Sequence, residues 1–175
     1  MPDLPSPWRE FLSELDARLA ESVALHCIGG FVISLFYGLP RPTGDIDYYT
    51  AIPSSPELDR LAGPGSALEA IHNVRLHRVT VTDMPEDYEE RLREMFPREF
   101  EKLHLFAVDP YDLILSKLGR NSGKDRDDAA YLFQTFALDS NVLEERYRKE
   151  LRPNLSLPDR GDLTLRLWLE IFRGD

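Results

Sequence analysis

Ile28-Gly29-Gly30, followed after fourteen intervening residues by Asp45-Ile46-Asp47, is the part of the sequence that decides the fold. The glycine pair closes a short apolar segment, and glycines that precede a helix leave backbone N–H groups available to hold a phosphate. Side chains alternate along a strand, so Asp45 and Asp47 project from the same face. Two neighbouring carboxylates repel each other unless a cation lies between them. The pattern therefore predicts a strand–turn–helix unit whose phosphate site faces a site for a divalent metal.

The size and composition indicate a globular protein. A chain of 175 residues suits one domain, or one domain with a small helical addition. No apolar run reaches the roughly 20 residues that span a bilayer. The start, Met1-Pro2-Asp3, lacks the basic and apolar regions of a signal peptide. Cys27 is the single cysteine, which excludes an internal disulfide framework and a multi-cysteine zinc site. We expect a cytoplasmic protein with no membrane partner.

The charge balance limits the class of partner. The formal net charge is -10 and the pI is about 4.9, which argues against an extended surface for nucleic acids. A local basic pocket for a nucleotide or an RNA end remains compatible with this charge. The acidic surface suits a partner with a basic face, and solubility alone also explains it.

The rest of the pattern predicts a sheet followed by helices. Predicted strands cover residues 24–28, 45–50, 74–82 and 103–108, and predicted helices cover 7–22, 30–37, 86–95, 110–118, 124–136 and 141–151. The first helix is expected to start at Ser6-Pro7, and residues 57–72 are weakly helical. The last helix is amphipathic, with apolar positions at Leu163, Leu167, Trp168, Ile171 and Phe172. The order predicts an α+β (α/β) fold, a mixed sheet flanked by helices, with a core over 1–108 and a helical C-terminal part over 109–175 packed on it.

Asp45 and Asp47 allow two interpretations. The first interpretation is a solvated turn, because prolines and a glycine precede these residues and aspartates favour turns. The other is a strand through Ile46 and Tyr48 with both acids on its polar face. Such a pair holds Mg²⁺ in phosphoryl and nucleotidyl transfer. The glycine pair upstream favours this second interpretation.

Residues near these motifs are further candidates. Arg41 is placed either to fork onto phosphate oxygens, to pair with an aspartate, or to lie on the surface as an ordinary arginine. Thr43 or Ser34 could supply a hydroxyl to a phosphate. Lys117 is either a phosphate ligand or a cation that opposes the dipole at its helix C-terminus. Acids at the start of the next helix, Asp125, Asp127 and Asp128, have a similar dipole explanation.

Gly29-Gly30 with Arg41-x-Thr43-x-Asp45-Ile46-Asp47 resembles the opening motif of the DNA polymerase β-like nucleotidyltransferase superfamily. The Arg-x-Thr-x-Asp-x-Asp form is particularly similar to the AbiEii-type toxins of bacterial toxin–antitoxin systems and to related small bacterial proteins. The resemblance covers residues 26–50 and 104–132. It implies a nucleotidyltransferase fold and metal-dependent transfer.

The resemblance also implies residue roles. Asp45 and Asp47 bind Mg²⁺, while Gly29, Gly30, Arg41 and Thr43 bind the nucleotide. Lys117 binds the triphosphate. Asp125 orients or deprotonates the acceptor, with Asp128 as the alternative for the later aspartate.

Two departures from the superfamily pattern stand out. Many members have Gly-Ser where this chain has Gly29-Gly30, so a phosphate-binding hydroxyl is missing. Polymerase-like members also use a third carboxylate on a later strand. Asp83 follows the predicted strand 74–82 and shares a face with Val79 and Val81, which are expected in the core. Either Asp83 turns toward the site from beyond the strand, or no third strand ligand exists.

Two functions therefore compete. The first is an enzyme that moves an NMP from an NTP to an acceptor hydroxyl on an RNA 3′ end such as that of tRNA, on a protein, or on a small molecule. By resemblance it would act as the toxin of a toxin–antitoxin pair, with an antitoxin protein as partner. The second is a non-catalytic relative of the same fold that binds a nucleotide or a protein partner.

Overall fold

The computed structural model describes residues 4–174, so the chain start considered above lies outside the described residues. These residues form a mixed five-stranded sheet with flanking helices, which confirms the predicted α+β class. The strands are β1 (Val23–Ile28), β2 (Asp45–Ile52), β3 (Arg75–Arg78), β4 (Arg93–Met95) and β5 (Leu103–Ala107). The helices are α1 (Trp8–Arg18), α2 (Gly29–Phe31), α3 (Glu57–Ala62), α4 (Ala67–His72), α5 (Pro110–Leu115), α6 (Gly123–Thr135), α7 (Ser140–Arg146) and α8 (Pro158–Arg173). π-helical turns continue α2 over Val32–Phe36 and α7 over Tyr147–Leu151, and short 3-10 turns cover Tyr88–Arg91 and Arg152–Asn154.

The chain divides into two compact units. Unit 1 comprises the chain up to Thr80 together with Leu92–Val108 and contains the whole sheet. Unit 2 comprises Val81–Arg91 and the chain from Asp109 onward. The domains predicted from sequence, 1–108 and 109–175, stay a prediction, and the compact units differ from them by the segment Val81–Arg91.

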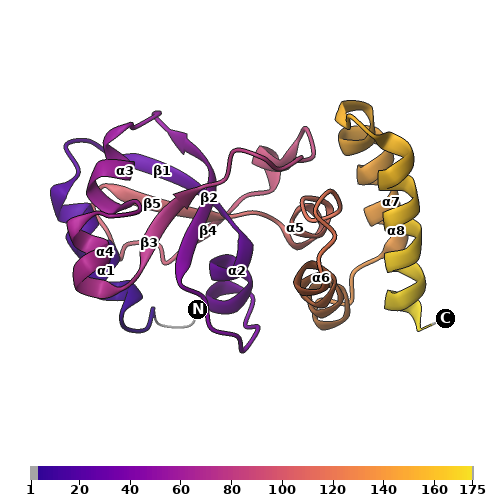
Figure 1. The fold of residues 1–175 in the computed structure, drawn as a ribbon, viewed down its shortest axis with the longest axis horizontal. Helices are drawn as coiled ribbons and strands as arrows, with labels where there is room; N and C mark the ends of the chain where they lie inside the picture. Colours follow the sequence, from indigo (N-terminus) through magenta and orange to yellow (C-terminus); the bar gives the residue numbers. More distant parts are fainter. Residues whose placement is uncertain (1–3, 175) are drawn as a thin grey trace. The chain divides into compact units, whose positions relative to one another are not determined.

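Unit 1 is built around β1, which lies in the middle of the strand order β3-β2-β1-β5-β4. β1 pairs antiparallel with β2 and parallel with β5, and β2 pairs parallel with β3. Helices α1, α3 and α4 pack together beside the sheet, whereas α2 contacts β2 (Figure 1). Asp16 of α1 accepts backbone hydrogen bonds from Lys102 and Leu103, both at 2.7 Å, and so ties α1 to the start of β5. This arrangement fixes the end of β1, where the glycine pair follows, beside β2.

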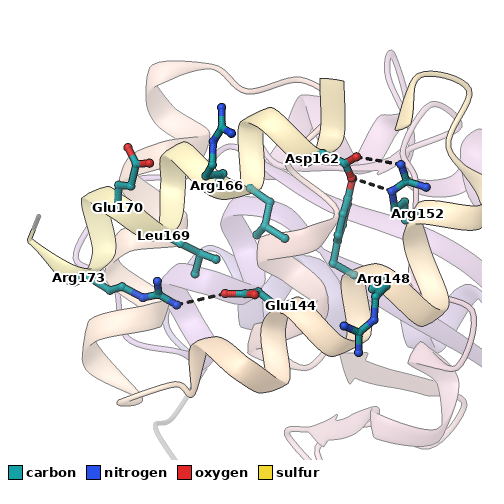
Figure 2. A pocket seen from close by; sticks show the side chains of 10 residues that line it. Glu144, Arg148, Arg152, Asp162, Arg166, Leu169, Glu170 and Arg173 are labelled. Atoms are coloured by element: carbon teal, nitrogen blue, oxygen red, sulfur yellow. Dashed lines mark hydrogen bonds and ion pairs between the residues drawn. The ribbon is translucent and has the colours of Figure 1, made fainter. Parts of the chain in front are cut away.

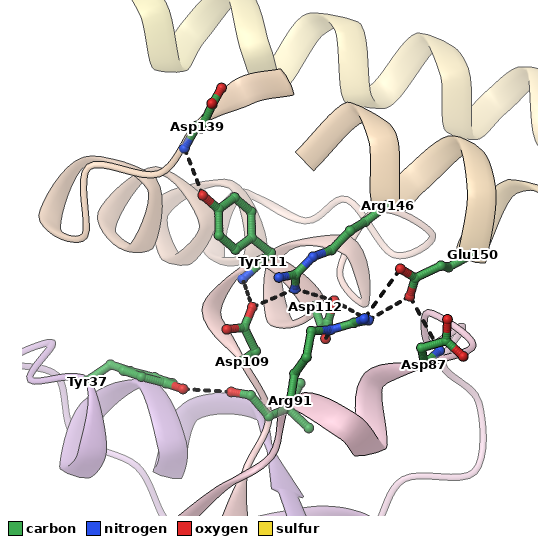
Figure 3. A network of polar contacts seen from close by, with 10 residues as sticks. Tyr37, Asp87, Arg91, Asp109, Tyr111, Asp112, Asp139, Arg146 and Glu150 are labelled. Atoms are coloured by element: carbon green, nitrogen blue, oxygen red, sulfur yellow. Dashed lines mark hydrogen bonds and ion pairs between the residues drawn. The ribbon is translucent and has the colours of Figure 1, made fainter. Parts of the chain in front are cut away.

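Unit 2 is helical and held by a buried ionic network (Figure 3). The Asp112 side chain is fully buried and accepts two hydrogen bonds from Arg91, at 2.8 and 3.2 Å. Arg91 also pairs with Glu150 at 2.6 Å, and Arg146 bridges Asp109 and Asp112. Burial raises the pKa of Asp112, and the Arg91 guanidinium opposes that rise. The network explains why Arg91, which lies before β4 in the sequence, belongs to unit 2.

Several predicted elements are wrong in extent. The strand predicted over 74–82 ends at Arg78, and Val81, expected in the core, is 92% exposed. Val79 still donates its N–H to Tyr48 of β2, but the chain then leaves the sheet, so β-branched residues beyond it have no strand to pair with. The helix predicted over 86–95 is a 3-10 turn followed by β4, because Met95 pairs with Leu105 of β5.

The helix ends also differ from expectation. α1 begins at Trp8 after Pro7, with no side-chain cap from Ser6. Trp168 and Phe172 of α8 are buried as expected, but the other predicted apolar positions are partly exposed: Leu163 by 46%, Leu167 by 45% and Ile171 by 55%. Sequence periodicity identified the helix, but it did not show which apolar face is covered.

Candidate functional site

The two aspartates lie on one face of β2, as their spacing predicts. Ile46 and Tyr48, which alternate with them, are 0% and 2% exposed. The carboxylates of Asp45 and Asp47 are on the other face, and their side chains are 39% and 28% exposed. The turn interpretation is therefore wrong, because both residues belong to the strand.

The glycine turn lies directly against Asp47. Ile28, the last residue of β1, is in register with Asp47. Gly29 has a φ of +72°, a conformation that side chains disfavour. A Cβ atom on Gly29 would also collide with Oδ2 of Asp47. The absence of a side chain at position 29 thus lets the carboxylate approach the start of α2.

Gly30 is adjacent to Thr43 rather than to an aspartate. A Cβ atom on Gly30 would lie 3.1 Å from Oγ1 of Thr43. The Thr43 hydroxyl donates to the carbonyl oxygen of Asp45 over 3.3 Å. Arg41, from the same motif, is partly buried and engaged in interactions of its own. The structure therefore brings Gly29, Gly30, Thr43 and Asp47 together within unit 1.

Strand β3 supplies two side chains that the sequence reasoning missed. Arg75 and His77 are in register with Asp45 and Asp47. Nε of Arg75 lies 2.9 Å from Oδ1 of Asp45, and Nδ1 of His77 lies 2.8 Å from Oδ1 of Asp47. Arg75 also pairs with Glu69 at 2.9 Å. The sequence carried only part of the signal: the two-residue spacing puts Arg75 and His77 on one face of their strand, but pairing and register decide whether that face meets the aspartates.

No third carboxylate comes from this part of the sheet. β3 carries no acidic residue, and Asp83 lies beyond it in unit 2. Among residues 4–174, no group of three or more His, Cys, Asp or Glu side chains is placed to hold a metal ion. A cation at this site would have Asp45 and Asp47 as its protein ligands. Mg²⁺ prefers oxygen ligands, and the carboxylates of Asp45 and Asp47 on one strand face supply them. Asp47 also lies beside a turn that no side chain fills.

The predicted residues of the second motif form a buried cluster in unit 2. Nζ of Lys117 lies 3.2 Å from Oδ1 of Asp125 and 2.9 Å from Oδ2 of Asp128. The Lys117 side chain is 7% exposed, and both aspartates are fully buried. Burial lowers the pKa of Lys117, and the charge of Asp125 opposes that shift. Lys117 is thus held inside its unit rather than displayed as a cation at a helix end.

Hydrogen bonds hold the Asp125 side chain in place within this cluster. It forms a capping box with Ser122 at the start of α6, and it accepts a hydrogen bond from Nε of Arg120 at 2.7 Å. Burial raises its pKa, but hydrogen bonds from Arg120 and Ser122 outweigh burial and hold that pKa well below its usual range. Both carboxylate oxygens are therefore already hydrogen-bonded within unit 2. The predicted roles of Lys117, Asp125 and Asp128 in transfer stay predictions.

A separate cavity of about 470 Å³ lies between α7 and α8 in unit 2, and none of the predicted site residues lines it. Figure 2 shows two of its arginines in ion pairs, Arg152 with Asp162 and Arg173 with Glu144. Leu165 and Leu169 contribute apolar surface. The sequence contained no motif that pointed to this cavity.

Two further findings concern Cys27 and the character of the helices. Cys27 is fully buried in β1, and burial raises the pKa of its thiol to about 12, so it is not a reactive nucleophile. Among residues 4–174, no helix has the length and apolar character to span a membrane.

Comparison with known proteins assigns the chain to a family. No curated protein and no solved structure matched it. A family described as "Nucleotidyltransferase of unknown function (DUF6036)" matches residues 9–163, a range that includes the glycine turn, both aspartates of β2 and the Lys117 cluster. Because the match covers most of the chain, the protein belongs to this nucleotidyltransferase family.

Proposed function

We propose that this protein is a Mg²⁺-dependent nucleotidyltransferase that moves an NMP unit from an NTP to an acceptor hydroxyl. The observation that carries the proposal is the contact between the glycine turn and Asp47. Oδ2 of Asp47 fills space that a Cβ on Gly29 would need, so a carboxylate suited to a metal and a backbone turn suited to phosphate are neighbours. Family membership supports the general chemistry of nucleotidyl transfer.

The residues of unit 1 would have separate roles in metal binding and phosphate binding. Asp45 and Asp47 would hold Mg²⁺, which neutralises the charge that develops on the transferred phosphoryl group. The backbone at Gly29 and Gly30 would hold phosphate oxygens. In the transfer, the acceptor oxygen bonds to the α-phosphorus and the bond to the β-phosphate breaks. Pyrophosphate leaves, and the hydroxyl proton passes to a base or to water.

Asp45 and Asp47 already have side-chain partners in this structure, and a cation must displace these partners in order to bind. Arg75 offsets part of the charge of Asp45, and the His77 imidazole hydrogen-bonds Asp47. All four side chains are at least 28% exposed, and exposed ion pairs contribute only about 0–1 kcal/mol. Exchange of these partners for Mg²⁺ therefore costs little.

Calorimetric titration with each of the four NTPs, with and without Mg²⁺, tests the binding part of the proposal. We expect binding that requires Mg²⁺ and that is lost in Asp45→Asn and Asp47→Asn. Asp59→Asn, which removes an exposed carboxylate of α3 that is not among the proposed metal or nucleotide ligands, should bind as the wild type does. Equal affinity in all four proteins, or no binding in any of them, would contradict the proposal.

Incubation with NTPs labelled at the α-phosphate tests transfer. Total RNA, protein and small-molecule fractions serve as acceptors in separate reactions. Label in the RNA fraction at 3′ ends would support the AbiEii-type toxin role, in which a separate antitoxin protein restrains the enzyme. Label in another fraction would support transfer with a different acceptor.

A second candidate function is non-catalytic nucleotide binding by the same site. The observation that favours it is the absence of a carboxylate on β3, where a basic and an imidazole side chain face the aspartates instead. This candidate predicts Mg²⁺-dependent NTP binding in calorimetry without label transfer to any fraction.

A further inference from the structure

We infer that the Thr43 hydroxyl is the phosphate-binding hydroxyl of this site and replaces a side-chain hydroxyl at position 30. This inference rests on the proposed function and names a residue that would bind phosphate within it. It explains why a glycine, with no hydroxyl of its own, occupies the second position of the turn.

The two glycines lack side chains for different reasons. Gly29 has a positive φ, so its backbone conformation favours glycine by itself. The φ of Gly30 lies outside that region, and its backbone therefore accepts a side chain. What opposes a side chain at position 30 is Oγ1 of Thr43, 3.1 Å from the place that a Cβ would occupy. The Thr43 hydroxyl, which reaches the turn from the loop before β2, thus occupies the space that a side chain at position 30 would need.

The Thr43 hydroxyl is available for a new partner. Its hydrogen bond to the carbonyl oxygen of Asp45 is 3.3 Å long, beyond the usual range for an O–H donor. Thr43 is partly exposed, so a ligand can reach it. A phosphate oxygen is a stronger acceptor than a backbone carbonyl, because a charged acceptor roughly doubles the strength of a hydrogen bond. Rotation of the hydroxyl from Asp45 toward a phosphate held at the turn is therefore favourable.

The position of this hydroxyl also suits the triphosphate chemistry. Thr43 touches the Gly30 side of the turn, while Asp47 touches the Gly29 side. A phosphate at the turn would then have a neutral hydroxyl donor on one side and a carboxylate that holds the metal on the other. The donor needs no charge of its own, since backbone amides and Mg²⁺ supply the positive partners.

Titration calorimetry with Mg²⁺ and either ATP or inorganic triphosphate tests the inference. Thr43→Val removes the hydroxyl with little change in shape and should weaken the affinity for both ligands about 10- to 100-fold, the range for one hydrogen bond to a charged group. Thr43→Ser keeps the hydroxyl and should stay within about threefold of the wild type. The melting temperature of each variant shows that it is folded.

Moving the hydroxyl from position 43 to position 30 tests whether its location beside the turn is what matters. Thr43→Ala removes the atom that opposes a side chain at position 30, so Gly30→Ser should be accommodated in that background. The double variant Gly30→Ser/Thr43→Ala should regain most of the affinity lost in Thr43→Ala. The matched control, Gly30→Ala/Thr43→Ala, has the same backbone and no hydroxyl, and should not regain it.

The outcomes separate this inference from the proposed function. If the wild type binds both ligands in a manner that depends on Asp47, yet Thr43→Val binds them equally well, the inference is wrong and the proposed function stands. Equal affinities in the two double variants would also overturn the inference. If the wild type binds neither ligand, the proposed function fails and the inference falls with it.

Discussion

Gly29 and Asp47 are sterically coupled: the carboxylate Oδ2 of Asp47 occupies space that a Cβ on residue 29 would need. The glycine belongs to the turn after β1, and the aspartate belongs to β2, so the antiparallel pairing of these strands brings the two together. Position 29 must therefore lack a side chain both for its backbone conformation and for the placement of Asp47.

Gly29→Ala should destabilise the protein more than a positive φ alone explains. An alanine in the left-handed region costs about 1–2 kcal/mol. Gly65 has a similar φ of +78°, with nothing within 4 Å of its missing Cβ, so Gly65→Ala measures that cost alone. The free energy of unfolding in urea should fall by at least about 1 kcal/mol more for Gly29→Ala. Equal losses in the two variants would show that Asp47 moves aside freely.

Asp45→Asn should change stability little. Repulsion between two acids alone would predict a gain, but the structure shows that Asp45 also pairs with Arg75. Both side chains are 39% exposed, and Arg75 keeps Glu69 as a partner. We expect a change within about 1 kcal/mol in the free energy of unfolding. A loss well beyond that, measured by urea unfolding, would show that the pair is structural and would weaken the metal-site argument.

Lys117→Met should strongly destabilise unit 2. It leaves the buried carboxylates of Asp125 and Asp128 without the ammonium that now lies within 3.2 Å of both. Removal of one partner from a buried ion pair costs about 3–5 kcal/mol. Lys124→Met, at an exposed position of α6, should change the free energy of unfolding by no more than about 0.5 kcal/mol.

A double variant distinguishes buried charge from lost packing at this position. Lys117→Met/Asp128→Asn should be more stable than the sum of the single changes predicts, because one uncompensated charge is removed. Additive losses would indicate that the lysine stabilises through its aliphatic chain.

Stability should depend on pH through Asp16. Burial alone raises the pKa of Asp16, but hydrogen bonds from the backbone of Lys102, Leu103 and Glu101 outweigh it, so the pKa in the folded state lies below 3.8. The unfolded state therefore binds the proton more tightly, and the stabilisation is present above pH 3.8 and lost as pH falls through the folded pKa. The difference in unfolding free energy between the wild type and Asp16→Asn should shrink below about pH 4. A constant difference from pH 7 to pH 3 would show that Asp16 contributes no charge-dependent stability.

Local patterns in the sequence determined the main parts of the fold and the chemistry-bearing residues of unit 1. Alternation along residues 45–48 placed Asp45 and Asp47 on one face, because that property depends only on strand geometry. The glycine pair marked the turn after β1, since Gly29 adopts a conformation that other residues disfavour. The family match agrees with the chemistry that these short motifs indicated.

Only the tertiary structure decided what surrounds those residues. Arg75 and His77 face the aspartates through the parallel register of β3 on β2, and no local pattern specifies which strands pair. The helix expected over 86–95 gave way to β4 because pairing with β5 outweighs weak local propensity. The sequence allowed two interpretations of Lys117, a triphosphate ligand or a cation at a helix C-terminus, and it did not show that Lys117 is buried between two aspartates of the next helix. Partners distant in sequence set burial, register and charge pairing, so these features emerge only when the chain is folded.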